Sequence, residues 1–218
     1  MGTWLNPVDI YCERLDASFW SEPINAITNL AFIIAGFLIW RIGSPRSRLM
    51  AILLILIGLG SFSFHTFANR LTGLLDVIAI ALYLLTFAYL IPKQWVRQSI
   101  WIQIGSVTFL IASIGLIQWG VTSLKPSLPW LPPGMYVGAW FALLVYAAIT
   151  QVSHPNAARY LRLAVLIFPL SLIGRQLDLP LCESSGGTHW LWHVLNGLTL
   201  YFSSYGLCLT RNTSKPTN

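Results

Sequence analysis

The sequence predicts an all-α membrane protein, a bundle of seven transmembrane helices. Of its 218 residues, 56% are hydrophobic and only 9% are charged, and the mean hydropathy is +0.66. A soluble domain usually carries about 25% charged residues, so this chain has too few charges to cover a surface that faces water. Its apolar runs are continuous, whereas the strands of a transmembrane β-barrel alternate apolar and polar residues.

Seven segments are apolar over a length that suits a hydrocarbon core about 30 Å thick, which needs roughly 20 helical residues. They are 23–40, 49–66, 72–91, 98–120, 133–152, 156–174 and 188–209. The sixth is the shortest apolar run, because only 12 residues separate Arg162 from Arg175. Helix-breaking residues mark the connections: Gly43-Ser44-Pro45 after the first segment, Lys125-Pro126 and Leu131-Pro132-Pro133-Gly134 before the fifth, His154-Pro155 before the sixth, and Ser185-Gly186-Gly187 before the seventh.

We expect a single domain over residues 1–210, followed by a disordered cytoplasmic tail at 211–218. Residues 1–22 contain four acids and lack the apolar core of a signal peptide. They are expected to form an acidic segment outside the cytoplasm.

The basic residues predict the orientation. Seven spans place the termini on opposite sides, with nine of the 13 Lys and Arg residues on one side and Arg14, Arg70, Lys125 and Arg175 on the other. The positive-inside rule puts the richer side in the cytoplasm, and so the N-terminus outside. The net charge of +6 is thereby explained by topology. The basic residues form no run of four, which argues against nucleic-acid binding.

Ionisable side chains within or beside the predicted spans are few: His65, Asp76, His189 and His193. In the predicted orientation all four lie near the outer face, with His65 and Asp76 roughly 8 Å deep at 1.5 Å per residue. Ionisable groups are unfavourable inside a bilayer. For an Asp the free-energy cost of insertion is about 2.5–3.5 kcal/mol. The common depth of these four side chains therefore predicts a functional site.

The spacing of the histidines favours a metal site. His189 and His193 are four residues apart and so share one helix face. With His65 they make three ligands and an open position, the pattern of a catalytic zinc. Asp76 could orient or deprotonate a water at the metal, and Ser61 could hydrogen-bond that water or the substrate. Haem ligation, histidines without any ligand, and a serine that only allows close helix packing are the alternatives.

Four stretches together resemble a known family. They are G-x-G-S-x-x-F-H at 58–65, Asp76 eleven residues after that histidine, H-x-x-W-H-x-L-x-G at 189–197, and Asp9-Ile10-Tyr11-Cys12-Glu13 with Glu22, Asn25 and Asn29. Over residues 9–197 the chain resembles the alkaline ceramidases, which belong to a larger group of seven-helix hydrolases and receptors.

The resemblance implies an amidase that cleaves ceramide, or a related N-acyl lipid, into a fatty acid and a sphingoid base. It implies zinc on His65, His189 and His193, with Asp76 as the general base and Ser61 assisting at the metal. A membrane lipid is then the expected partner, and no protein partner is implied. The alternative is a seven-helix receptor or binding protein with a structural zinc and no turnover.

The resemblance also implies calcium, held by Asp9, Glu13 and Glu22 with the backbone carbonyl of Tyr11. The chain departs from the family here, with one extra residue before Cys12 and a shorter interval between Glu13 and Glu22. A family asparagine falls at Leu15 or Asp16, of which only Asp16 can bind through its side chain. Four acids in 14 residues can supply the oxygen ligands that calcium needs, although a solvated acidic segment is the alternative.

Two of the three cysteines, Cys12 and Cys182, lie in predicted outer segments. Because that compartment is oxidising, we expect them to form a disulfide, with three reduced cysteines as the alternative. Cys208 is expected to be a buried free thiol. The short loops suit a bacterial inner membrane, with the active site near the outer face.

Overall fold

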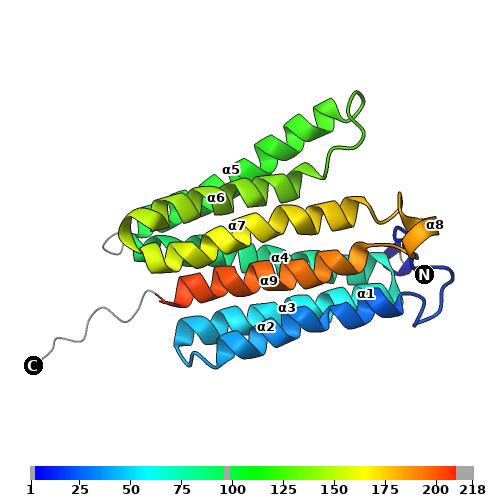
Figure 1. The fold of residues 1–218 in the computed structure, drawn as a ribbon, viewed down its shortest axis with the longest axis horizontal. Helices are drawn as coiled ribbons and strands as arrows, with labels where there is room; N and C mark the ends of the chain where they lie inside the picture. The colour runs from blue at the N-terminus through cyan, green and yellow to red at the C-terminus, as the bar shows by residue number, and fades with distance from the viewer. Residues whose placement is uncertain (1–2, 96–98, 210–218) are drawn as a thin grey trace, which may run out of the picture.

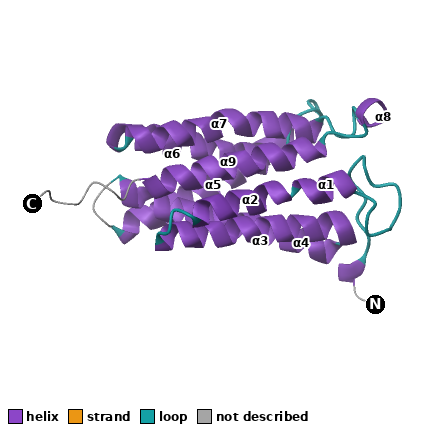
Figure 2. Cartoon of the chain, turned by 60° about the horizontal axis from the view of Figure 1, so that its bottom comes forward, coloured by secondary structure: helices purple, strands orange, loops and turns teal. Residues whose placement is uncertain are grey.

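The computed structural model describes residues 3–95 and 99–209, and the regular structure in these ranges is helical (Figures 1 and 2). The predicted tail at 211–218 lies outside them. The elements in chain order are η1 (Thr3–Leu5), α1 (Pro23–Thr28), α2 (Leu30–Trp40), α3 (Pro45–Phe67), α4 (Arg70–Leu90), η2 (Ile91–Gln94), α5 (Ile100–Leu124), α6 (Gly134–Ser153), α7 (Pro155–Gln176), α8 (Cys182–Ser185) and α9 (His189–Leu209). Within the described part of the chain there is no strand, which confirms the all-α prediction.

Six helices in the described ranges are long and apolar enough to cross a membrane, so the chain is an integral membrane protein. They run over Pro23–Trp40, Pro45–Phe67, Arg70–Gln94, Ile100–Leu124, Gly134–Ser153 and Pro155–Gln176. The first is divided at Asn29 into α1 and α2. The seventh predicted segment corresponds to α9. This helix has 21 residues but is less apolar than the six helices above. Its buried face carries two histidines, Asn196, Thr199, Ser203 and Ser204.

Serine and asparagine caps set two of the helix starts. The Ser44 hydroxyl accepts a hydrogen bond from the backbone N–H of Ser47 and so begins α3. Asn69 begins α4 in the same way, by accepting from the N–H of Thr72. Each cap satisfies a backbone donor that an α-helix leaves without an internal partner.

The helices run side by side along one axis, and α9 lies within the bundle rather than at its edge (Figure 1). It packs against α7 and α2 and also contacts α1, α3 and α4. A Cβ on Gly197 would lie 2.8 Å from the Cβ of Ala31, so this glycine is what allows α9 to approach α2 so closely.

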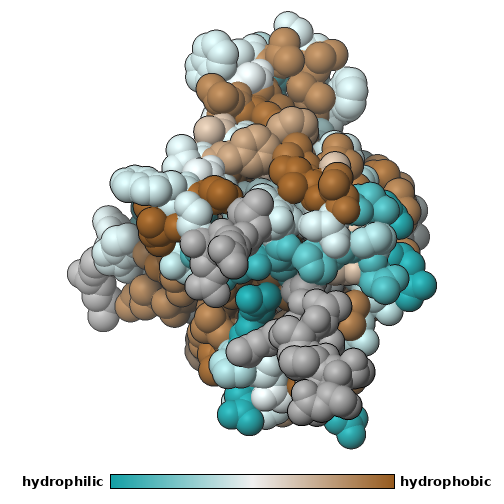
Figure 3. Space-filling view, turned by 90° about the vertical axis from the view of Figure 1, so that its left-hand side faces the viewer, coloured by the Kyte–Doolittle hydropathy of each residue, from teal (hydrophilic) through white to brown (hydrophobic). Residues whose placement is uncertain are grey.

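The main apolar core occupies the half of the bundle toward the C-terminus of α9. Ile39, Met50, Leu54, Leu161 and Leu207 are fully buried there. Figure 3 views the bundle from this end, where hydrophilic side chains gather near the middle and lower edge beside apolar flanks. The opposite half carries the polar residues from which the site is built.

Candidate metal centre

Three buried histidines meet at the end of the bundle opposite the apolar core. His65 lies in the last turn of α3, while His189 and His193 lie in the first two turns of α9. Each is 1–2% exposed, and one ring nitrogen from each lies within 4.8 Å of the others. In the described residues no other group of three or more His, Cys, Asp or Glu side chains is close enough to share a metal ion.

The hydrogen bonds of these histidines fit a metal site. Nδ1 of His65 lies 2.6 Å from Oε2 of Glu22, and Nδ1 of His193 lies 2.9 Å from the hydroxyl of Thr28. Nε2 of His193 and Nδ1 of His189 are buried without a hydrogen-bond partner. Buried polar atoms are nearly always paired, so unpaired nitrogens in a histidine cluster favour a bound cation. Three histidines suit zinc with an open coordination position.

Asp76 and Ser61 lie beside the histidines. Both line the same cavity as the three rings. Oδ1 of Asp76 is buried and has no hydrogen-bond partner. This oxygen is therefore free to accept a proton from a group in the cavity.

The cavity continues from the histidines along the bundle. Its far end is lined by Phe87, Leu110, Tyr146 and Ser203. His189 and Ser203 are 14 residues apart on α9, which corresponds to roughly 21 Å along the helix. A cavity with the histidines at one end and a mostly apolar lining beyond them suits a lipid with an acyl chain.

Comparison with known proteins identifies the family. A family model described as Ceramidase matches residues 11–218. The chain belongs to the ceramidase family. This confirms the resemblance inferred from the sequence motifs. No curated protein matches the chain. Family membership implies a hydrolase that acts on the amide bond of ceramide, a membrane lipid.

Glu22 is a central residue of the candidate site. The carboxyl is 3% exposed. Its Oε1 lies 2.5 Å from Nε of Arg14, and its Oε2 also accepts a bond from the Asn25 amide at 3.2 Å. Burial acts to raise the pKa of Glu22, but the hydrogen bonds and charge of His65 and the bonds from Arg14 and Asn25 hold that pKa below its ordinary value. A carboxylate bonded to the outer nitrogen of a histidine orients the ring toward a metal.

The acidic residues that were expected to bind calcium have other partners or are exposed in the structure. Glu13 accepts hydrogen bonds from the backbone N–H groups of Ile24 at 2.6 Å and Asn25 at 2.8 Å. Asp16 is exposed and bonds to Ser18, which holds the pKa of Asp16 below its ordinary value. Asp9 is exposed. The calcium expectation therefore finds no support among the described residues.

Arg14 lies where the acidic segment meets the histidines. In addition to Glu22, its guanidinium donates to the backbone carbonyls of Asp16 at 3.1 Å and His65 at 3.0 Å. The buried guanidinium of Arg14 thus binds the carboxylate of Glu22 and these two carbonyl oxygens. The sequence analysis assigned Arg14 to topology and did not foresee this contact.

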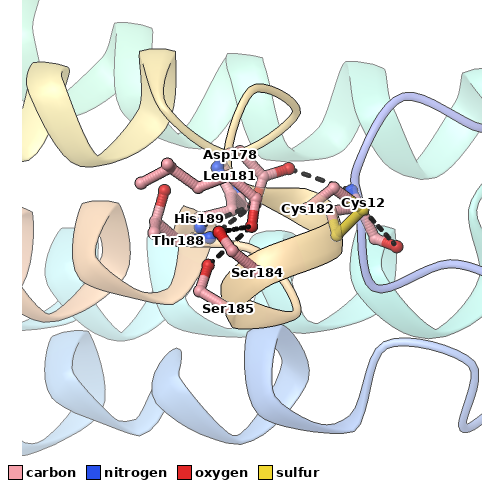
Figure 4. Close-up of a disulfide and its surroundings, with 8 residues drawn as sticks. All are labelled: Cys12, Asp178, Leu181, Cys182, Ser184, Ser185, Thr188 and His189. Carbon is pink, nitrogen blue, oxygen red and sulfur yellow. Dashed lines mark hydrogen bonds between the residues drawn. A yellow bond between two sulfur atoms is a disulfide. The ribbon is translucent and has the colours of Figure 1, made fainter.

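Asp178 is a second residue that the sequence analysis missed. It is 3% exposed, and its Oδ1 accepts hydrogen bonds from the backbone N–H groups of Thr188 and His189, each at 2.9 Å. Its Oδ2 accepts one from the N–H of Cys12 at 2.9 Å. Figure 4 shows these contacts beside the Cys12–Cys182 disulfide, whose Cα atoms lie 5.4 Å apart. The signal in the sequence that could have identified Asp178 was its position as an isolated acid just after the sixth apolar segment.

Tyr11 covers the histidines from the N-terminal segment. Its ring stacks on that of His189, with centroids 3.8 Å apart. Burial raises the pKa of the Tyr11 hydroxyl well above its ordinary value, although Arg175 acts to lower it. The hydroxyl is therefore neutral, and the ring closes one side of the site. The backbone carbonyl of Tyr11, the expected calcium ligand, accepts a hydrogen bond from the N–H of Arg14 at 3.2 Å.

Proposed function

We propose that this chain is a zinc-dependent amidase that hydrolyses ceramide, or a related N-acyl lipid, to a free fatty acid and an amine. The observation that carries the proposal is the buried cluster of three histidines at the head of a long cavity. Membership of the ceramidase family supplies the reaction class.

His65, His189 and His193 would hold the zinc ion. When bound, zinc polarises a carbonyl oxygen and lowers the pKa of a water to about 7. Glu22 and Thr28 orient the rings of His65 and His193 through their outer nitrogens.

Asp76 is the proposed general base and acid. Its unpaired Oδ1 accepts a proton from water and returns it to the leaving amine, a role that typically contributes about 10²–10⁴-fold to a rate. Ser61 lines the same cavity and holds this carboxyl in position. The apolar part of the cavity holds the acyl chain and excludes water.

The proposal includes seven spans, with α9 as the seventh. The ends of α2 and α4, the helix η2 and the starts of α3 and α7 lie at one end of the bundle. In or directly beside these segments are Arg41, Arg46, Arg48, Lys93, Arg159 and Arg162. The positive-inside rule favours the cytoplasm for that end. The active site and residues 1–22 then lie at the outer face of a bacterial inner membrane.

The decisive experiment is the metal content of detergent-purified protein, measured by elemental mass spectrometry. We expect one zinc per chain in the wild type and in a His154→Ala control, and none in a His65→Ala/His193→Ala double variant. Zinc that is absent from the wild type, or that persists in the double variant, would contradict the proposal.

A second measurement separates an enzyme from a receptor. Asp76→Asn should keep its zinc and lose hydrolysis of a ceramide by about 10²-fold or more. Zinc in both proteins, with no turnover of any N-acyl lipid by the wild type, would favour a receptor with a structural zinc.

A further inference from the structure

Arg175, near the end of α7, projects into the proposed active-site cavity. It lines the same space as the three histidines and Asp76. Within the described chain it is the only Lys or Arg among the residues that line this cavity. A charged group that is largely removed from water is unfavourable unless it is paired, so its presence calls for a compensating interaction.

Aromatic rings surround this guanidinium. Its Cζ lies 5.6 Å from the ring centroid of Tyr11, 5.5 Å from that of Tyr136 and 5.7 Å from that of Trp192. Cation–π contacts of this kind stabilise the charge. They orient the side chain but use none of its five N–H donors.

The donors of Arg175 are mostly unused. Nη1 makes one long hydrogen bond to the Tyr11 hydroxyl at 3.4 Å, and Nε is buried with no partner. The ion pairs formed within the described ranges join Glu22 to Arg14 and to His65, and none includes Arg175. The nearby acid Asp178 is occupied by three backbone N–H groups. Asp76 lines the same cavity and interacts with Arg175 through space, but among the described residues no carboxylate forms a contact ion pair with this guanidinium.

We infer that Arg175 binds the carboxylate of a lipid in this cavity, because its planar guanidinium matches a carboxylate in a two-point hydrogen bond. The inference rests on the proposed function and adds a substrate feature to it. The carboxylate has two possible sources, the fatty acid released by hydrolysis and an acidic amine part, as in an N-acyl amino acid. Ceramide has a neutral head group and offers Arg175 no such partner before it is cleaved.

Binding of three ligands with the same acyl chain tests this directly: hexadecanoate, N-hexadecanoylglycine and the neutral N-hexadecanoylethanolamine. Affinities are measured on detergent-purified wild type, Arg175→Gln and Arg175→Lys, with the exposed Arg159→Gln on the same helix as the control. Equal zinc content is established first, since a carboxylate can also bind the metal.

We expect the wild type and the control to bind at least one acid more tightly than the ethanolamide. Arg175→Gln should weaken binding of that acid by about tenfold or more, which corresponds to about 1.4 kcal/mol, and leave the ethanolamide unchanged. Arg175→Lys keeps the charge and should keep part of the preference. Loss confined to hexadecanoate identifies the product carboxylate, and loss confined to the glycine conjugate identifies an acidic substrate.

The inference is overturned if the wild type shows no preference for either acid. It is also overturned if Arg175→Gln weakens all three ligands equally, because that result indicates a structural role. Binding requires no turnover, so these outcomes are readable even if the amidase proposal fails.

Discussion

Oε2 of Glu22 lies 2.6 Å from Nδ1 of His65, although 43 residues separate them in the chain. The carboxylate lies immediately before α1, and the histidine lies in the last turn of α3. The contact therefore ties the N-terminal segment to a candidate metal ligand, and it leaves the other nitrogen of that ring for the metal.

Glu22→Gln should lower zinc affinity by about 10–100-fold, the usual effect of losing a carboxylate behind a metal-binding histidine. Competition with a chromogenic chelator measures the change. Glu183→Gln, an exposed position in α8, is the matched control and should behave as wild type. An unaltered zinc affinity in Glu22→Gln would refute the proposed role of this carboxylate.

Asp178→Ala should destabilise the protein by at least about 2 kcal/mol, because three backbone N–H groups lose a charged acceptor. The start of α9 should loosen, and zinc occupancy should fall with it. The midpoint of thermal unfolding in detergent and the zinc content are the two readouts. Asp9→Ala removes an exposed acid and should leave both unchanged; equal effects of the two variants would contradict this prediction.

The Cys12–Cys182 disulfide leaves one free thiol, Cys208. Maleimide labelling of the denatured protein should add one label before reduction and three after it. Removal of the bridge in a Cys12→Ser/Cys182→Ser variant should lower the thermal midpoint, since such cross-links typically contribute about 2–4 kcal/mol. Three labels without a reductant would show that the cysteines are reduced in the purified protein.

Calcium should not stabilise the wild type, because the Arg14 guanidinium already binds Glu22 and two backbone carbonyls at the expected position. Titration with calcium, followed by a chelator selective for it, should leave the thermal midpoint unchanged. Arg14→Ala should destabilise the protein by about 3–5 kcal/mol, the cost of leaving one member of a buried ion pair alone. A wild-type midpoint that rises with calcium and falls with the chelator would restore the calcium assignment.

Much of the bundle is predictable from the sequence because a span must satisfy its backbone hydrogen bonds internally. Long apolar helices are therefore visible in composition, and the first predicted segment matches the structure at both ends. The α9 segment is the exception. Its inward face is polar where it carries His189, His193 and Asn196. Mean hydropathy therefore underestimates the ability of this helix to span a membrane.

The histidine cluster was predictable because depth and helical spacing alone bring His65 to the pair on α9. Its supporting contacts were not. Glu22 and Asp178 act on residues of other elements, and no local pattern reveals which distant N–H or imidazole a carboxylate will meet. Arg175 was counted as a loop charge because its position at the end of a helix did not show which way its side chain points.

The Cys12–Cys182 bridge and the contact of Thr28 with His193 join the N-terminal segment to α9 and the loop before it, and Glu22 joins that segment to His65. Because synthesis proceeds from the N-terminus, Glu22, Thr28 and His65 are made well before the helix that supplies the other two ligands. The proposed zinc site is therefore complete only after α9 has been made and inserted. A chain that is interrupted before α9 lacks two of the three histidines and should not take up zinc.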